Sequence, residues 1–244
     1  MVEAVAPVRA EMLLDLADRA AREAPIERAL AVARAAGEDA PSLRDAPLGR
    51  LNAAVIGFHT ALTGPRLDAV ASCPSCDAVV EFALDADELR ALAPRDGGTG
   101  DFGIEGGYRV CWRVPTAADL AAVADDPDGA SALLARCAEA TGDAGPLDVA
   151  ELPPAVVDRI EAELAAADPL AEVSAGLTCP ECGVAFDADL DPAAFVWTEV
   201  EAGARRVLVE VDALARAYGW TEPEVLALSE ARRQAYLEIV REGG

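Results

Sequence analysis

Two stretches of the chain share one pattern: CPSCDAVVEF at residues 73–82 and CPECGVAFDADL at residues 179–190. Each begins with a C-P-x-C turn, and the run that follows alternates apolar side chains with other side chains, as a half-buried strand does. A strand-like run also precedes each turn, LDAVASC at residues 67–73 and AEVSAGLTC at residues 171–179. The chain therefore contains an internal repeat, predicted as strand, tight turn and strand.

The spacing of the cysteines indicates a metal site. Two intervening residues let both thiolates face one ion from a single turn, and the residue after the second cysteine often needs a left-handed backbone. Gly183 adopts that conformation without strain, and Asp77 tolerates it. One pair offers two ligands, whereas structural zinc takes four in a tetrahedron. We predict one structural Zn²⁺ in a split zinc ribbon, with the ligands Cys73, Cys76, Cys179 and Cys182.

The separation of the two pairs is unusual for a zinc ribbon. Between Cys76 and Cys179 lie 102 residues, where ribbons usually have ~15–20. The entropy of loop closure grows only logarithmically, so this length costs about one further kcal/mol relative to a short loop. Zinc binding, which is worth ~10 kcal/mol or more, exceeds that cost. The residues between the pairs are therefore predicted to form an inserted subdomain.

Other interpretations of the cysteines remain open at this point. A thioredoxin-like redox couple needs its cysteines at a helix N-terminus, and strand-like runs follow both pairs here. Two separate metal sites would each need further ligands, and His59 is the single histidine of the chain. Catalytic zinc usually uses His or carboxylate ligands and keeps an open position. A chance spacing, or a ribbon without metal, is the remaining alternative.

The periodicity predicts an α+β, mainly helical fold with helical arms at both ends. The predicted segments are an N-terminal helical region (1–66), a first zinc-knuckle hairpin (67–92), a strand plus helical insertion (93–170), a second zinc-knuckle hairpin (171–191) and a C-terminal helical arm (192–244).

Shorter patterns within these segments predict loops, a helix and helix caps. Residues 37–49 and the glycine-rich residues 94–107 are predicted as loops from their Gly, Pro and Asp content. Residues 130–140 (ASALLARCAEA) are predicted as a helix. Capping boxes, in which a Thr and an acidic residue three positions later exchange hydrogen bonds, are predicted at Thr116 and Thr221.

Composition limits the function classes. The chain has 244 residues, 52% hydrophobic residues and a net charge of −24, and all of its basic residues are arginine. So acidic a surface repels phosphate backbones and anionic lipid, so neither nucleic acid nor a membrane is expected as a partner. No apolar run approaches the ~18 residues of a membrane span, and the start resembles an amphipathic helix rather than a signal peptide. A cytoplasmic protein with thiols or metal ligands, not disulfides, is expected.

Single residues outside the cysteine pairs carry weaker signals. His59 lies in an apolar helical pattern and is expected to be a packed or surface histidine rather than a ligand. Cys111 and Cys137 are expected to be small buried side chains rather than nucleophiles. Arg109 and Arg113 share a strand face with Cys111, and are expected either to pair with Glu81 or Asp187 or to be solvated.

Several segments, taken in order, resemble a known family. They are LGRLNAAVIGFHTALTGPRLDAVASCPSC (48–76), YRVCWRVPTAADL (108–120), LLARC (133–137), LTCPECGVAFDADLDPAAFVWTEVE (177–201) and DALARAYGWTEPEVLALSEARRQAYLEIV (212–240). This order resembles the baseplate hub assembly chaperones of contractile-tailed phages and phage-tail-like injection particles. The resemblance implies a non-enzymatic assembly role, a protein partner among tail or baseplate components, and zinc on the four cysteines.

Two other functions compete with this one. A zinc-ribbon interaction module in another setting, such as transcription, usually has basic ribbon tips, and the tips here, CPSCD and CPECG, are neutral to acidic. A CxxC thiol oxidoreductase is the third hypothesis. Apolar residues of the tail, such as Leu214, Tyr218 and Leu237, either form a partner surface or bury against the chain's own core, and Trp220 either anchors that corner or enters a partner's groove.

Overall fold

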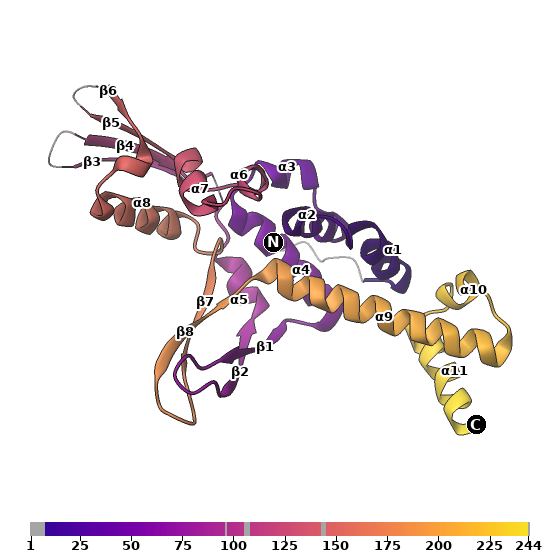
Figure 1. The fold of residues 1–244 in the computed structure, drawn as a ribbon. Helices are drawn as coiled ribbons and strands as arrows, with labels where there is room; N and C mark the ends of the chain where they lie inside the picture. The colour runs from indigo at the N-terminus through magenta and orange to yellow at the C-terminus, as the bar shows by residue number, and fades with distance from the viewer. Residues whose placement is uncertain (1–7, 96, 105–107, 143–144, 244) are drawn as a thin grey trace.

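A computed structural model describes residues 8–95, 97–104, 108–142 and 145–243. Figure 1 shows a body of helices from which three parts project: a small sheet with its helix, a pair of hairpins, and a helical arm that carries the C-terminus. Helices account for 56% of the described residues, so the predicted α+β, mainly helical class is confirmed. Within the described part of the chain, no helix has both the length and the apolar character needed to cross a bilayer.

The body is built from the N-terminal helices and the first half of a long helix near the C-terminus. These helices are α1 (Ala10–Ala20), α2 (Pro25–Ala35), α3 (Ala40–Arg44), α4 (Leu48–Thr63) and α9 (Pro192–Tyr218). Leu13, Leu51 and Val200 belong to their shared core. Gly203 lets α1 approach α9 closely, because a Cβ at this position would lie 3.1 Å from the Leu13 side chain. The stretch 37–49, predicted as a loop, contains α3, whose Ala40 and Leu43 are buried.

Two antiparallel hairpins carry the cysteine pairs. The first consists of β1 (Arg66–Ser72) and β2 (Val79–Asp85), and the second of β7 (Val173–Thr178) and β8 (Ala185–Leu190). They lie next to each other below the body in Figure 1. Each hairpin is followed directly by a helix, α5 (Ala86–Ala91) or α9. The strands predicted on both sides of each C-P-x-C turn are confirmed.

Between the hairpins the chain forms a four-stranded antiparallel sheet as well as helices. Its strands, in the order β3-β4-β5-β6, are β3 (Thr99–Ile104), β4 (Tyr108–Arg113), β5 (Ala138–Gly142) and β6 (Gly145–Leu147). The helical elements are α6 (Ala117–Val123), α7 (Gly129–Cys137), the 3₁₀ turn η1 (Val149–Glu151) and α8 (Pro154–Ala167). Helix α8 covers one face of the sheet, where Ile160 packs with Phe102 and Val110.

Two predictions about this region are wrong. The glycine-rich stretch, predicted as a loop, contains β3, in which Gly100 pairs with Trp112 of β4. A Cβ at Gly100 would lie 2.4 Å from the indole of Trp112, so the tryptophan covers the glycine and supplies the packing that the glycine lacks. The helix predicted over residues 130–140 ends at Cys137, and Ala138 begins β5 because it pairs with Trp112.

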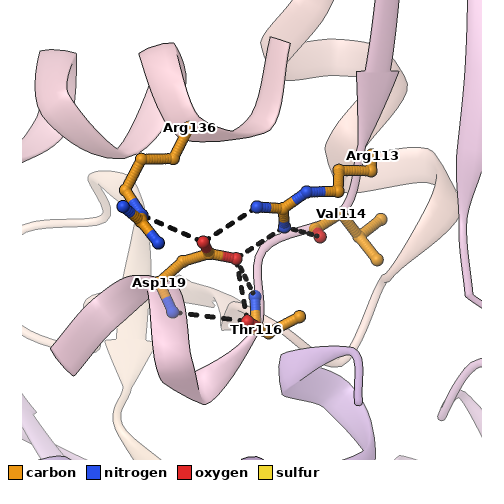
Figure 2. A network of polar contacts seen from close by, with 5 residues as sticks. All are labelled: Arg113, Val114, Thr116, Asp119 and Arg136. Atoms are coloured by element: carbon orange, nitrogen blue, oxygen red, sulfur yellow. Dashed lines mark hydrogen bonds and ion pairs between the residues drawn. The ribbon is translucent and has the colours of Figure 1, made fainter. Parts of the chain in front are cut away.

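One buried carboxylate ties the sheet to its helices. Figure 2 shows Asp119, at the start of α6, between two arginines. Arg113 at the end of β4 donates two hydrogen bonds to its carboxylate, one of them 2.8 Å long, and Arg136 of α7 donates another at 3.0 Å. The predicted capping box with Thr116 is confirmed. Arg113 lowers the pKa of Asp119 far below its usual range, although burial opposes this.

Of the alternatives expected for two arginines on β4, pairing with Glu81 or Asp187 is wrong, whereas Arg109 is solvated, with 71% of its side chain exposed. Arg113 pairs with Asp119, and Arg109 pairs with Asp101 of β3 at 3.0 Å, rather than with carboxylates of the hairpins. Both partners lie close in the sheet or the following turn, so local geometry decides these pairs. The thiol of Cys111, which was expected to be buried, is exposed, whereas Cys137 is buried as expected.

The C-terminal arm is the second half of α9 together with α10 (Glu222–Leu226) and α11 (Glu230–Gly243). Leu214, Val225 and Leu237 form its small core, so these apolar residues pack within the chain itself. Trp220 stacks on Tyr218 with ring centroids 4.7 Å apart and therefore anchors the corner after α9. The capping box predicted at Thr221 is confirmed, and a buried ion pair joins α9 to α11.

Candidate metal centre

The first C-P-x-C turn is held by its own backbone. The N–H of Cys73 donates to the carbonyl of Ala78, and the N–H of Asp77 donates to the carbonyl of Cys73, both at 2.9 Å. Asp77 has a φ of 57°, the left-handed conformation expected after the second cysteine. It is the one non-glycine residue with positive φ among the described residues, which sets this turn apart from the rest of the backbone.

The second turn repeats this geometry. The N–H of Cys179 donates to the carbonyl of Val184, and the N–H of Gly183 donates to the carbonyl of Cys179, again both at 2.9 Å. Gly183 has a φ of 75°, in the position that corresponds to Asp77. Because Gly has no Cβ, the second turn adopts the left-handed conformation at no steric cost. The internal repeat seen in the sequence is therefore a repeat of structure.

The two turns bring their four sulfurs together. The Sγ atoms of Cys73 and Cys182 are 3.6 Å apart, and those of Cys76 and Cys179 are 3.7 Å apart. All four Sγ atoms lie within 4.8 Å of one another. Four sulfurs placed at ~2.3 Å around a tetrahedral ion would be ~3.8 Å apart, so these distances fit one ion and are far longer than a ~2.05 Å disulfide bond. The cluster is able to hold one metal ion.

The cluster has approximate two-fold symmetry. Superposing the repeats exchanges Cys73 with Cys179 and Cys76 with Cys182. The same operation exchanges the 3.6 Å pair with the 3.7 Å pair, so each hairpin contributes equivalent distances. Neither hairpin alone supplies more than two sulfurs, and both are needed to surround one ion.

The surroundings of the cluster differ between its inner and outer sulfurs. Cys73 is 0% exposed and Cys179 is 1% exposed, and both pack with Val80. Cys76 and Cys182, the second cysteine of each turn, are exposed. An ion bound here would therefore be shielded from the side of the hairpins and would lie near water on the other side.

The thiols of the two cysteines in the first turn differ in pKa. The backbone N–H of Ser75 lowers the pKa of Cys73 to about 7, although burial opposes this. The N–H of Ala78 lowers the pKa of Cys76, but the neighbouring sulfur of Cys182, burial and the other two sulfurs together raise it to about 12. One thiolate forms readily, whereas the next resists ionisation beside it. A cation between the sulfurs would remove that resistance, because it favours the charged form of each.

A buried histidine joins the base of the first hairpin to α9. His59 of α4 is buried, its Nδ1 lies 2.7 Å from a carboxylate oxygen of Glu199 on α9, and its Nε2 lies 3.1 Å from the carbonyl of Arg66, the first residue of β1. Burial lowers the pKa of His59, but the hydrogen bond and charge of Glu199 outweigh it and leave the pKa raised. The expectation of a packed histidine is confirmed, and within the described residues the cysteines alone form the cluster.

Two aspartates that position the hairpins were missed as functional groups. Asp85 is the last residue of β2 and Asp191 directly follows β8, and each carboxylate accepts hydrogen bonds from two backbone N–H groups of the next helix. The signal was present in the sequence, because both repeats end in Leu-Asp and an aspartate before a helical run is a common N-cap.

The chain matches no protein family, no curated protein and no solved structure. The geometry of the cluster is thus the observation from which function can be argued. The resemblance to baseplate hub assembly chaperones, the absence of enzymatic activity and the division into five segments stay predictions.

Proposed function

We propose that Cys73, Cys76, Cys179 and Cys182 bind one structural Zn²⁺, which holds the two hairpins together. The observation that carries this proposal is the convergence of four Sγ atoms, from turns 102 residues apart in the chain, to within 4.8 Å of one another. A tetrahedral all-sulfur set is typical of zinc and of iron. Four protein ligands leave no open position for a substrate or water, which favours a structural ion over a catalytic one.

Elemental analysis tests this proposal directly. The protein, purified without added metal chelator, is expected to contain one zinc per chain by inductively coupled plasma mass spectrometry. Native mass spectrometry should give the same ratio for the intact molecule. Iron in place of zinc, with its visible absorption bands, would overturn the choice of ion, and a chain without stoichiometric metal would overturn the site.

The same geometry argues against a thiol oxidoreductase. In thioredoxin-like enzymes the helix N-terminus lowers the pKa of the attacking cysteine. Here strands follow both cysteine pairs, and each inner cysteine is buried behind the hairpins. An insulin reduction assay is expected to show no more activity for the wild-type chain than for a Cys73→Ser variant.

For the biological role, we propose a non-enzymatic cytoplasmic assembly or adaptor protein of a contractile, phage-tail-like particle. Its support is the ordered set of segments from residue 48 onward, together with a net charge of −24 that disfavours nucleic acid and lipid as partners. The neutral to acidic turn tips also speak against a ribbon that contacts nucleic acid. A metal-pinned scaffold with a projecting arm suits a protein that binds other proteins.

A quantitative pull-down from the native host tests that role. Tagged protein is expected to enrich tail or baseplate components over a tagged, unrelated acidic protein. Enrichment of RNA polymerase subunits, together with a salt-dependent gel shift on DNA, would favour the transcriptional alternative and overturn the assembly role.

A further inference from the structure

A groove opens where the body, the inserted region and the base of the second hairpin meet. Its volume is 620 Å³, within the ~300–1,000 Å³ typical of binding pockets. Segments from α2, α4, α6, β7, β8 and the start of α9 line it. We call it the junction groove.

The floor of the junction groove is apolar. Leu48 and Leu51 of α4 lie at its base and belong to the core of the body. Ile26 of α2, Leu120 of α6 and Ala193 of α9 pack against the same core and are only half-buried. The groove is therefore a place where the apolar core of the body is open to the surface, and an apolar side chain placed there would be removed from water.

The rim of the junction groove is acidic. Glu172, Asp189 and Asp191 line it and are exposed, and among its described lining residues none is basic. No arginine of the described chain forms an ion pair with any of the three. Arg28 of α2 donates instead to the carbonyls of Ala20 and Ala21 and lies over the ring of a tryptophan.

A second groove in the body differs in this respect. It lies among α1, α2 and α3, has a volume of 830 Å³, and is lined by both signs of charge. Arg44 and Glu27, both in its lining, pair with each other at 2.6 Å. The chain thus compensates its own charges in that groove, whereas in the junction groove the carboxylates lack a cationic partner from the described chain.

We propose that the junction groove binds a segment of a partner protein in which an apolar side chain is flanked by lysine or arginine. The apolar side chain would occupy the floor, and the cations would reach the carboxylates of the rim. Such complementarity of charge speeds encounter and selects the partner, while burial of the apolar side chain provides affinity. The proposal rests on the proposed assembly role only in taking the partner to be a protein.

Defined peptides test the proposal without knowledge of the partner. The probe is a fluorescent, short amphipathic peptide of leucine and lysine. One control has the same pattern with glutamate in place of lysine, and the other has serine in place of leucine. Fluorescence anisotropy at physiological salt is expected to show binding of the leucine/lysine peptide, no binding of the glutamate peptide, and affinity of the serine/lysine peptide lower by about tenfold or more.

Charge-matched double variants locate the binding. Glu172→Arg with Asp189→Arg reverses two rim charges and leaves Asp191, the cap of α9, intact. The control, Glu161→Arg with Asp187→Arg, makes the same change in net charge at exposed positions outside the groove. The groove variant is expected to weaken the leucine/lysine peptide by about tenfold, and the control by less than about twofold.

The groove can also be filled without changing charge. Ala124→Trp places an indole at an exposed lining position and should abolish binding, while circular dichroism and zinc content stay those of the wild type. Equal losses in both double variants would show attraction by net charge alone and overturn the proposal. So would the absence of leucine/lysine binding, or a change of oligomeric state in the groove variants, which would make a second copy the occupant. Zinc measured on the same samples separates these results from failure of the metal site.

Discussion

The paired cysteine hairpins and the inserted sheet differ in the residues that pack their strands together. Both bring strands together into projections from the helical body (Figure 1). The sheet has an apolar core of its own, in which Phe102, Val110 and Ile160 pack under α8. At the hairpin tips, the buried residues are Val80 and two of the cysteines themselves. The difference teaches that the tips have little apolar surface of their own, so an ion bound by the four sulfurs would supply the link that an apolar core supplies in the sheet.

Loss of the ion should have the largest effect, because it should unfold the hairpins and leave the sheet folded. Cys179→Ser removes an inner ligand, and chelation removes the proposed zinc, whose binding contributes ~10 kcal/mol or more to folding. We expect hydrogen exchange of β1, β2, β7 and β8 to rise to near that of exposed chain, while β4 and α8 stay protected. Cys111→Ser, at an exposed thiol outside the cluster, is the control. Equal loss of protection in the sheet would show that the two parts unfold as one.

Removal of Asp119 should have the opposite effect, because it should destabilise the sheet and its helices and leave the metal site intact. Asp119→Ala takes away the acidic half of the capping box of α6 and leaves two arginines without their carboxylate, although both are more than 40% exposed and can be solvated. We expect a loss of about 2–3 kcal/mol in the free energy of unfolding, with zinc content unchanged. Urea denaturation measures it, and Asp101→Ala, which removes an exposed pair, should cost less than ~1 kcal/mol. A loss of zinc in Asp119→Ala would contradict the independence of the two regions.

The stability that the pair of His59 and Glu199 contributes should depend on pH. Because the pKa of His59 is raised in the folded chain, its charged pair with Glu199 contributes fully below the unfolded pKa of ~6.5. That contribution is lost as pH rises through the folded pKa. The wild type is therefore expected to lose more stability than His59→Gln between about pH 6 and pH 8. Thermal unfolding of the metal-loaded proteins at several pH values measures this, and parallel curves would show that His59 is not the group responsible.

The smallest effect should distinguish the two knuckles from each other. Gly183→Ala places a Cβ at a φ of 75° and should reduce the stability of the second knuckle by about 1 kcal/mol. Asp77→Gly relieves the same conformation in the first knuckle and should change stability by less than about 1 kcal/mol. Competition with a chromophoric zinc chelator reads out both. If the two changes had the same effect, the left-handed conformation would not be what the turns require.

The sequence was sufficient where structure depends on neighbours in the chain. The hairpins, the left-handed residue after each cysteine pair and the capping box at Thr116 all follow from patterns a few residues long. It was insufficient where a distant residue decides. Strand β3 depends on Trp112 covering Gly100, and Ala138 leaves the helical pattern because it pairs with the same tryptophan. The junction groove is formed by six separate elements, and nothing in any one of them marks it.

The long separation between the two cysteine pairs has a consequence for biosynthesis. Cys73 and Cys76 leave the ribosome 106 and 103 residues before Cys179, so the inserted sheet can fold while the first hairpin still has only half of the proposed ligands. A chain that stops short of Cys182 cannot complete a four-sulfur site, however well its earlier parts have folded. Capture of the ion would thus distinguish a chain that contains both hairpins from one that stops before the end of the second.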